Sequence, residues 1–150
     1  MIRKINKFKQ LPHEQRILFI EAWLLSGYYR ISLKLVSFKR LIRLPEQQQS
    51  REDTIHLTDL QKTVSDSVAR TVARMAGNTP WQSACLIQAL VAQNMLRRRG
   101  IPGVIFLGVK KDQNDTDQID SHAWLKCGET IITGLKGIDE FTVISRFSWE

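Results

Sequence analysis

Hydrophobic positions follow a helical period over the first hundred residues and a period of two after that. In the first segment the apolar positions lie three or four residues apart: Ile17, Ile20, Trp23 or Leu24, and Tyr28. This spacing predicts a helix from about Pro12 to Leu44, with a break near Gly27, and proline suits its first position. Pro45 ends the segment, and the polar stretch EQQQSRED reads as a connector.

A second helix is signalled by its start, its stripe and its end. Thr58 and Gln61 have the spacing of a capping box. One apolar stripe follows at helical spacing: Leu60, Val64, Val68, Val72 and Met75. Gly77 occupies the position where a left-handed C-cap is expected.

A third helix is predicted from about Ser83 to Arg99, with Ser83 as its N-cap. The run of three arginines at 97–99 favours the negative end of a helix, and Gly100 is a typical stop.

The pattern then changes to that of strands. Residues 104–109 (VIFLGV) form a short buried run, and residues 121–127 and 130–133 flank Gly128-Glu129 like the arms of a hairpin. Residues 141–147 are consistent with one more strand. Helices followed by an antiparallel sheet make an α+β fold.

Length and charge bound the function. The 150 residues fit a single domain, with a helical region over about 1–76. The net charge of +7 is concentrated in residues 1–51, which hold eleven Lys or Arg and three acids. A solvated helical face is the default interpretation of these cations. An acidic partner, a membrane surface or a bound peptide are alternatives, the membrane not being favoured. The arginine run is interpreted as a solvated helix end rather than a nucleic-acid patch.

Two cysteines without a secretory signal favour a reducing compartment, so we expect a cytoplasmic protein. The most apolar stretch, residues 17–38, carries Glu21, Arg30 and Lys34 at mid-span, which argues against a transmembrane helix.

Cys85 is the first candidate for chemistry. It falls in the first turn of the third predicted helix, where unpaired backbone N–H groups favour a thiolate and could stabilise an oxyanion. The alternative is a buried cysteine acting as a small hydrophobe.

His122 is the second candidate. It lies in the strand SHAWL at 121–125, where alternation places His122, Trp124 and Lys126 on one face. A cysteine on a helix and a histidine on a strand are the papain-like arrangement for nucleophilic catalysis. A surface histidine is the alternative.

An ordered set of motifs carries a family resemblance. WQSACLIQAL at 81–90, LRRRGIP at 96–102, Gly108-Val109 and HAWL at 122–125 together resemble the transglutaminase-like leader peptidases of lasso-peptide biosynthesis. The resemblance covers about residues 80–147. The ending, with Thr133-Gly134 and FTVI at 141–144, is similar to the subset in which the peptidase and the leader-binding module are separate chains.

The resemblance implies a fold and a function. Residues 77–150 would form a papain/transglutaminase-like core, with Cys85 as nucleophile and His122 as general base and acid. The substrate would be a ribosomally made precursor peptide, and the partners a separate leader-binding protein and an asparagine-synthetase-like cyclase. No cofactor or metal is implied.

The third catalytic position departs from the family pattern. Relatives often place an aspartate about a dozen residues after the histidine, where this chain has Ile131-Ile132-Thr133-Gly134. Asp120 or Asp139 could orient the imidazole instead, as could a backbone carbonyl or Thr133. Gln82 is a candidate second oxyanion donor, with a local capping role as its alternative.

The remaining candidates are interpreted as structural. Cys127 falls on the strand face opposite His122, and no Cys-x-x-Cys pair suggests zinc. His13 and His56 are expected in solvent, and Trp23, Tyr28 and Tyr29 are expected in the core.

Two further functions stay open. The vacant acid position is compatible with a catalytically inactive peptide-binding or docking module. An acyl-enzyme could also transfer its acyl group to an amine rather than to water.

Overall fold

The computed structural model describes residues 8–42, 46–47, 55–80, 84–111 and 119–150. Its helices are α2 (His13–Leu35), α3 (Phe38–Ile42), α4 (Asp59–Ala76) and α5 (Cys85–Arg97). Its strands are β1 (Glu46–Gln47), β2 (Gly103–Lys111), β3 (Ile119–Cys127), β4 (Thr130–Thr133) and β5 (Thr142–Trp149), with a 3-10 turn η2 (Ile138–Glu140) before β5. Helices followed by an antiparallel sheet confirm the α+β class.

The sheet has the order β1-β5-β2-β3-β4, and all of its neighbouring strands are antiparallel. The predicted hairpin is present as β3 and β4, and its turn residue Gly128 has a φ of 55°. β1 was not predicted, because it is two residues long and lies in the polar connector.

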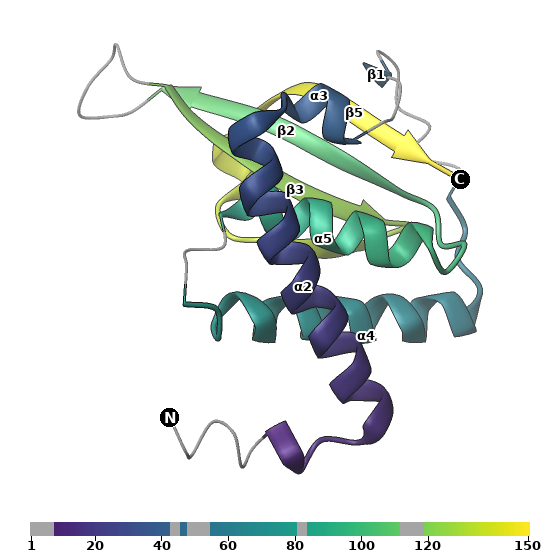
Figure 1. The fold of residues 1–150 in the computed structure, drawn as a ribbon. Coiled ribbons are helices and arrows are strands. Elements are labelled where there is room, and N and C mark those ends of the chain that lie inside the picture. The colour runs from purple at the N-terminus through teal and green to yellow at the C-terminus, as the bar shows by residue number, and fades with distance from the viewer. Residues whose placement is uncertain (1–7, 43–45, 48–54, 81–83, 112–118) are drawn as a thin grey trace.

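Helix α5 is the centre of the fold. It packs on β2, β3 and β4 with one side and on α2 and α4 with the other (Figure 1). Eight of its residues are buried: Ile87, Ala89, Leu90, Val91, Ala92, Gln93, Met95 and Leu96. A helix that is apolar nearly all round is stable only when it is covered on every side, and the sheet and the two helices provide this cover.

The prediction that Gly100 ends α5 is confirmed, and the structure shows how it does so. Gly100 has a φ of 65°, and the Ile101 N–H donates to the carbonyl of Leu96 at 3.1 Å, which closes a Schellman-type end. The Arg99 guanidinium binds both carboxylate oxygens of Glu21, at 2.6 and 3.2 Å, and so ties the end of α5 to α2.

Helix α4 begins as predicted but ends differently. Thr58 and Gln61 form both hydrogen bonds of the capping box. The left-handed cap at Gly77 is wrong, because Gly77 has a φ of −79°. Asn78 instead donates its side-chain amide to the carbonyl of Arg74 at 2.7 Å, so this helix end is satisfied without a left-handed residue.

Helix α2 runs through Gly27, so the predicted break there is also wrong. An interior glycine costs about 1 kcal/mol relative to alanine. Burial of the neighbouring Ala22, Ser26 and Tyr29 offsets that cost. The chain leaves the helix at Val36, which is extended, and α3 follows.

Two of the three aromatic residues expected in the core of this region are not there. Tyr29 is buried, whereas Trp23 and Tyr28 are exposed. Within the described residues, no helix is long and apolar enough to cross a membrane.

The sheet carries a different hydrophobic cluster on each face. The face toward α5 contributes Ile105, Ala123, Leu125 and Cys127 to the main core. The other face carries a smaller cluster of Val104, Phe106 and Trp124, against which Ile55, Ile138, Phe141 and Val143 pack.

Gly108 lets the second cluster close. It lies opposite His122 in the β2–β3 ladder, and a Cβ there would lie 2.9 Å from both Phe141 Cβ and the Trp124 ring. Gly108→Ala should therefore lower the free energy of unfolding by about 1–3 kcal/mol through overpacking, measured by urea denaturation. Gly77→Ala is the control, because its Cβ would meet nothing closer than 3.9 Å. Equal stability of the two variants would contradict the close packing at Gly108.

Candidate active site

Cys85 lies in the first turn of α5, as the sequence predicts, and it is the first residue of the helix. Ala84 stands at the N-cap, and the first helical hydrogen bond runs from the Gln88 N–H to the Ala84 carbonyl at 3.1 Å. The N–H groups of residues 85–87 thus have no acceptor within the helix. The thiol is free and half-buried, and it packs against the main core. This environment supplies a positive helix end to a thiolate and N–H donors to an oxyanion. The prediction of Ser83 as the N-cap is wrong, because Ala84 occupies that position; Ser83 itself lies outside the described residues.

His122 lies in β3 with its ring held on three sides. Its ring centroid is 5.9 Å from that of Trp124 and 5.0 Å from that of Phe141. Its Nε2 lies 2.7 Å from the backbone carbonyl oxygen of Gly134. A carbonyl oxygen only accepts hydrogen bonds, so Nε2 carries the proton of this bond. In the neutral ring Nδ1 is therefore unprotonated, and it is the atom that can act as a base.

Gly134 can form this contact because it has no side chain. Its φ is 76°, and a Cβ would lie 2.5 Å from the Ala123 carbonyl oxygen and 2.8 Å from Trp124 Cβ. Glycine thus brings the backbone close enough to β3 for its carbonyl to hold His122. This carbonyl lies where relatives often have an aspartate, twelve residues after the histidine, and it matches the backbone-carbonyl alternative.

The other predicted orienters lie elsewhere. Asp120 is exposed in β3 opposite Lys110, and Asp139 is exposed in η2. Among the described residues neither forms a hydrogen bond with the His122 ring, and each remains a prediction as an orienter. The Thr133 hydroxyl is buried and has no hydrogen-bond partner within the part of the chain that the structure describes. Gln82 lies outside the described residues.

The turn that carries Asp139 is fixed by its neighbour. Glu140 forms an ion pair with Lys110 at 2.6 Å, and this contact lowers the pKa of Glu140. The Lys110 ammonium also lies 4.9 Å from the centroid of the Phe141 ring. These contacts hold η2 and Phe141 beside β2, next to His122.

The two reactive side chains do not form a hydrogen bond with each other in the described structure. Cys85 packs on the core between α5 and the sheet, whereas the His122 ring lies with Trp124 and Phe141 on the other face. Among the described residues, no strand pairs with β3 on the β4 side between Ile119 and Ala123, since the β3–β4 ladder covers only residues 125–127. We call residues 119–123 on this side the open edge of β3.

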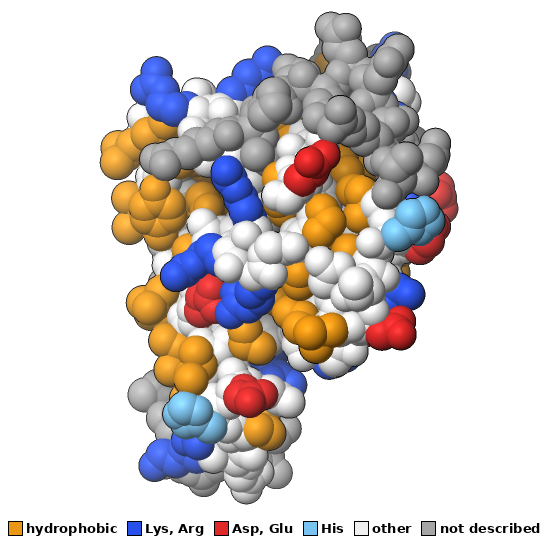
Figure 2. Space-filling view, turned by 90° about the vertical axis from the view of Figure 1, so that its right-hand side faces the viewer, with side chains coloured by type: hydrophobic (Ala, Val, Ile, Leu, Met, Phe, Trp, Pro, Cys, Tyr) orange, Lys and Arg blue, Asp and Glu red, His pale blue; other side chains and the backbone are white. Residues whose placement is uncertain are grey.

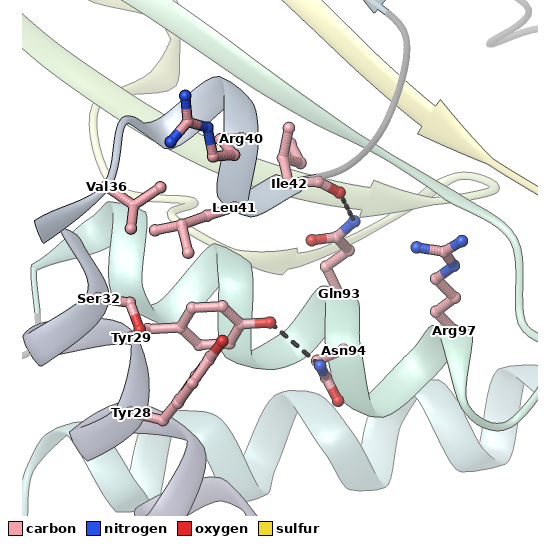
Figure 3. Close-up of a pocket in the computed structure, with 10 residues that line it drawn as sticks. All are labelled: Tyr28, Tyr29, Ser32, Val36, Arg40, Leu41, Ile42, Gln93, Asn94 and Arg97. Carbon is pink, nitrogen blue, oxygen red and sulfur yellow. Dashed lines mark hydrogen bonds between the residues drawn. The ribbon is translucent and has the colours of Figure 1, made fainter.

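A cavity lies away from both residues. It has a volume of about 370 Å³ and lies between α2, α3 and the C-terminal half of α5 (Figure 3). Tyr29, Asn94 and Gln93 line it, with Arg40 and Arg97 also present. The Asn94 amide donates to the Tyr29 hydroxyl at 3.0 Å, and the Gln93 amide donates to the Ile42 carbonyl at 3.4 Å. These bonds tie α5 to α2 and α3.

Among the described residues, no group of three or more His, Cys, Asp or Glu side chains is placed to hold a metal ion.

Comparison with known families identifies the chain. The transglutaminase-like superfamily matches residues 24–146, which is most of the sequence and includes all but the start of the helical region. The chain belongs to the transglutaminase-like superfamily. The match begins inside α2, well before the motifs at 80–147, so the helices are part of the family pattern. No curated protein and no solved structure shows a significant match.

Sequence reasoning found the helix-borne cysteine and the strand histidine but did not select the ring's partner. The available signal was Thr133-Gly134 directly after a strand, because a glycine there permits both a left-handed turn and a close approach. The aromatic contact from Phe141 was not predicted, since Phe141 was assigned only to a possible strand.

The contact between His122 and Gly134 predicts the tautomer of the ring. The neutral imidazole should carry its proton on Nε2, which ¹⁵N NMR of the ring nitrogens measures directly. Gly134→Ala should shift the tautomer equilibrium, because the added Cβ displaces the carbonyl. Gly137→Ala is the matched control: its φ is 75°, but its Cβ would meet only Glu140 Oε1 at 3.8 Å. Both variants pay about 1–2 kcal/mol for the left-handed alanine. An Nδ1–H tautomer in the native protein would contradict the assignment.

The two cysteines should differ in reactivity. Burial raises the pKa of Cys127 to about 12, so that residue stays a protonated thiol up to strongly alkaline pH. Iodoacetamide should therefore alkylate Cys85 alone in the native protein between about pH 6 and pH 9, because the thiolate is the reactive form and the Cys127 thiol stays protonated in this range. Mass spectrometry of tryptic peptides assigns the label, and unfolding in urea should expose Cys127 as well. Comparable labelling of both cysteines in the native state would contradict the burial of Cys127.

Proposed function

We propose that this protein is a cysteine peptidase that removes the leader from a ribosomally synthesised lasso-peptide precursor. The superfamily commonly carries cysteine peptidase and transglutaminase chemistry, and the motifs around Cys85 and His122 resemble its leader peptidases. The observation that carries the proposal is the bond from His122 Nε2 to Gly134, because it leaves Nδ1 free to act as a base.

The proposed reaction has two steps. The Cys85 thiolate attacks the carbonyl carbon of the leader–core amide, and the free N–H groups at the start of α5 stabilise the oxyanion. The imidazolium of His122 protonates the departing amine of the core peptide, which leaves the leader as a thioester on Cys85. Water, deprotonated by His122, then hydrolyses the thioester and restores the thiol.

Catalysis in this scheme requires the two side chains to come together. They would meet at the open edge of β3, beside Gly134. Hydrogen bonds in unliganded active sites are often long and tighten only when substrate binds. We therefore propose that precursor binding at this edge completes the pair.

The proposal includes partners and a compartment. A separate leader-binding protein would present the precursor, and an asparagine-synthetase-like cyclase would use the new amine for macrocyclisation. These reactions would take place in the cytoplasm. Aminolysis of the same thioester by an amine would give transfer instead of hydrolysis, and mass spectrometry of the products separates the two.

A second function, an inactive peptide-docking module, is favoured by one observation. The thiol and the imidazole are not hydrogen-bonded in the described structure, and their packing partners lie on opposite faces of the sheet. A chain that only docked a peptide would need no closer approach.

Reconstituted cleavage distinguishes these two functions. With the precursor and its leader-binding protein present, Cys85→Ala should abolish leader removal, and His122→Ala should lower its rate at least about 100-fold, a typical general-base contribution. Cys127→Ala is the control and should retain cleavage. Chromatography with mass detection follows the released core peptide. Full cleavage by Cys85→Ala would refute the nucleophile, and the absence of cleavage by the unmodified protein would favour the docking module.

A further inference from the structure

The outward face of α2 is apolar along most of its length. Six large hydrophobic side chains on this face are between 48 and 79 % exposed: Ile17, Ile20, Leu24, Tyr28, Ile31 and Leu35. The opposite face of the same helix buries Ala22, Ser26 and Tyr29. Figure 1 shows α2 lying across the outside of α4 and α5. In Figure 2, where this side of the molecule is turned to the left, hydrophobic side chains gather in a column along the left-hand edge. A helix that is apolar on both faces requires a second covering surface.

The exposed area is large enough for a stable interface. At these exposed fractions the six side chains, which we call the α2 stripe, present roughly 700 Å² per protomer, against about 800 Å² per partner in a standard interface. Contiguous apolar patches of this size on soluble proteins mark interaction sites.

The α2 stripe is self-complementary about Leu24. Ile20 and Tyr28 lie four residues on either side of Leu24, and Ile17 and Ile31 lie seven residues on either side. An antiparallel helix paired with its own copy brings together positions at equal offsets from the two-fold axis. This register would place Ile17 against Ile31 of the second copy, Ile20 against Tyr28 of the second copy, and the two Leu24 side chains against each other.

Charge follows the same symmetry. Glu14 lies ten residues before Leu24 and Lys34 ten residues after it, and both side chains are exposed near the ends of α2. The antiparallel register would set each Glu14 at the same level as Lys34 of the other copy, although on the opposite flank of the helix pair, since ten residues turn a helix by about 80° away from Leu24 in opposite senses. Neither residue forms an ion pair within the described part of the chain. Opposite charges at the same level favour this register over the parallel one, in which like charges would share a level, by a small, salt-screened amount.

We propose that the α2 stripe is a homodimer interface, in which α2 of one copy packs antiparallel against α2 of a second copy about a two-fold axis at Leu24. The axis position explains why the apolar residues and the flanking charges share one centre. This inference does not depend on the proposed peptidase activity.

Sedimentation velocity of the full chain over a concentration series tests the proposal. The unmodified protein should sediment as a dimer at micromolar concentration, and Leu24→Glu should be monomeric, because it places two carboxylates against each other at the axis. Leu60→Glu is the matched control, since Leu60 is 74 % exposed on α4, away from the α2 stripe, and this variant should remain dimeric. Circular dichroism checks that each variant is folded.

Charge exchange tests the register. Glu14→Lys or Lys34→Glu alone should raise the dimer dissociation constant about 2- to 3-fold at low salt, since each brings like charges to the same level at both ends of the helix pair. The double variant Glu14→Lys/Lys34→Glu should restore it, as should an equal mixture of the two single variants. Single variants without effect, or a double variant without rescue, would overturn the antiparallel register.

Three results would overturn the dimer itself. The first is an unmodified protein that is still monomeric at about 100 μM, a concentration at which a specific dimer should be almost fully associated. The second is a dimer that persists in Leu24→Glu. The third is a monomer that co-sediments with anionic lipid vesicles or with the leader-binding protein through the α2 stripe. The last result would assign the stripe to a membrane or to a heterologous partner.

Discussion

Burial of α5 is the constraint on which the rest of the structure depends. Eight of its thirteen residues are buried, and the sheet, α2 and α4 each cover part of it. Its first residue is Cys85, so the packing that stabilises the fold also fixes the position of the thiol. The Glu21–Arg99 pair and the Tyr29–Asn94 bond then fasten α2 along the same helix.

The histidine is fixed by a different set of contacts. Trp124 and Phe141 hold its ring, and Gly134 accepts its Nε2 proton, all on the sheet face away from α5. The nucleophile and the base therefore belong to separate packing units on opposite faces of the same sheet. A carbonyl in place of an aspartate sets the tautomer without adding a negative charge.

Features with local causes were predictable from the sequence. The capping box at Thr58, the hairpin turn at Gly128 and the stop at Gly100 each follow from neighbouring residues, and each is present. Predictions failed where tertiary contacts decided the outcome. Gly27 stays helical because its neighbours are buried, and Gly77 needs no left-handed cap because Asn78 satisfies the helix end. The spacing of Ile17, Ile20 and Tyr28 correctly indicated a helix but could not tell which face the core would cover.

The sequence could not identify the hydrogen-bond partner of His122, because that partner too is set by a tertiary contact. A backbone carbonyl leaves no side-chain signature, and Gly134 reaches β3 only through the turn after β4. Asp120 and Asp139 were visible as acids near His122 in sequence, yet nearness in sequence does not set the direction of a side chain relative to the ring.

The most direct measurement is the pH dependence of Cys85 alkylation, compared between the unmodified protein and His122→Ala with Cys127 replaced by alanine in both. If precursor binding brings the imidazole to the thiol, removing His122 should move the alkylation profile recorded with bound precursor to higher pH, because the thiolate loses its cationic partner. Superimposable profiles, with the folded state verified by circular dichroism and with the bound precursor giving the same result, would contradict a Cys85–His122 pair.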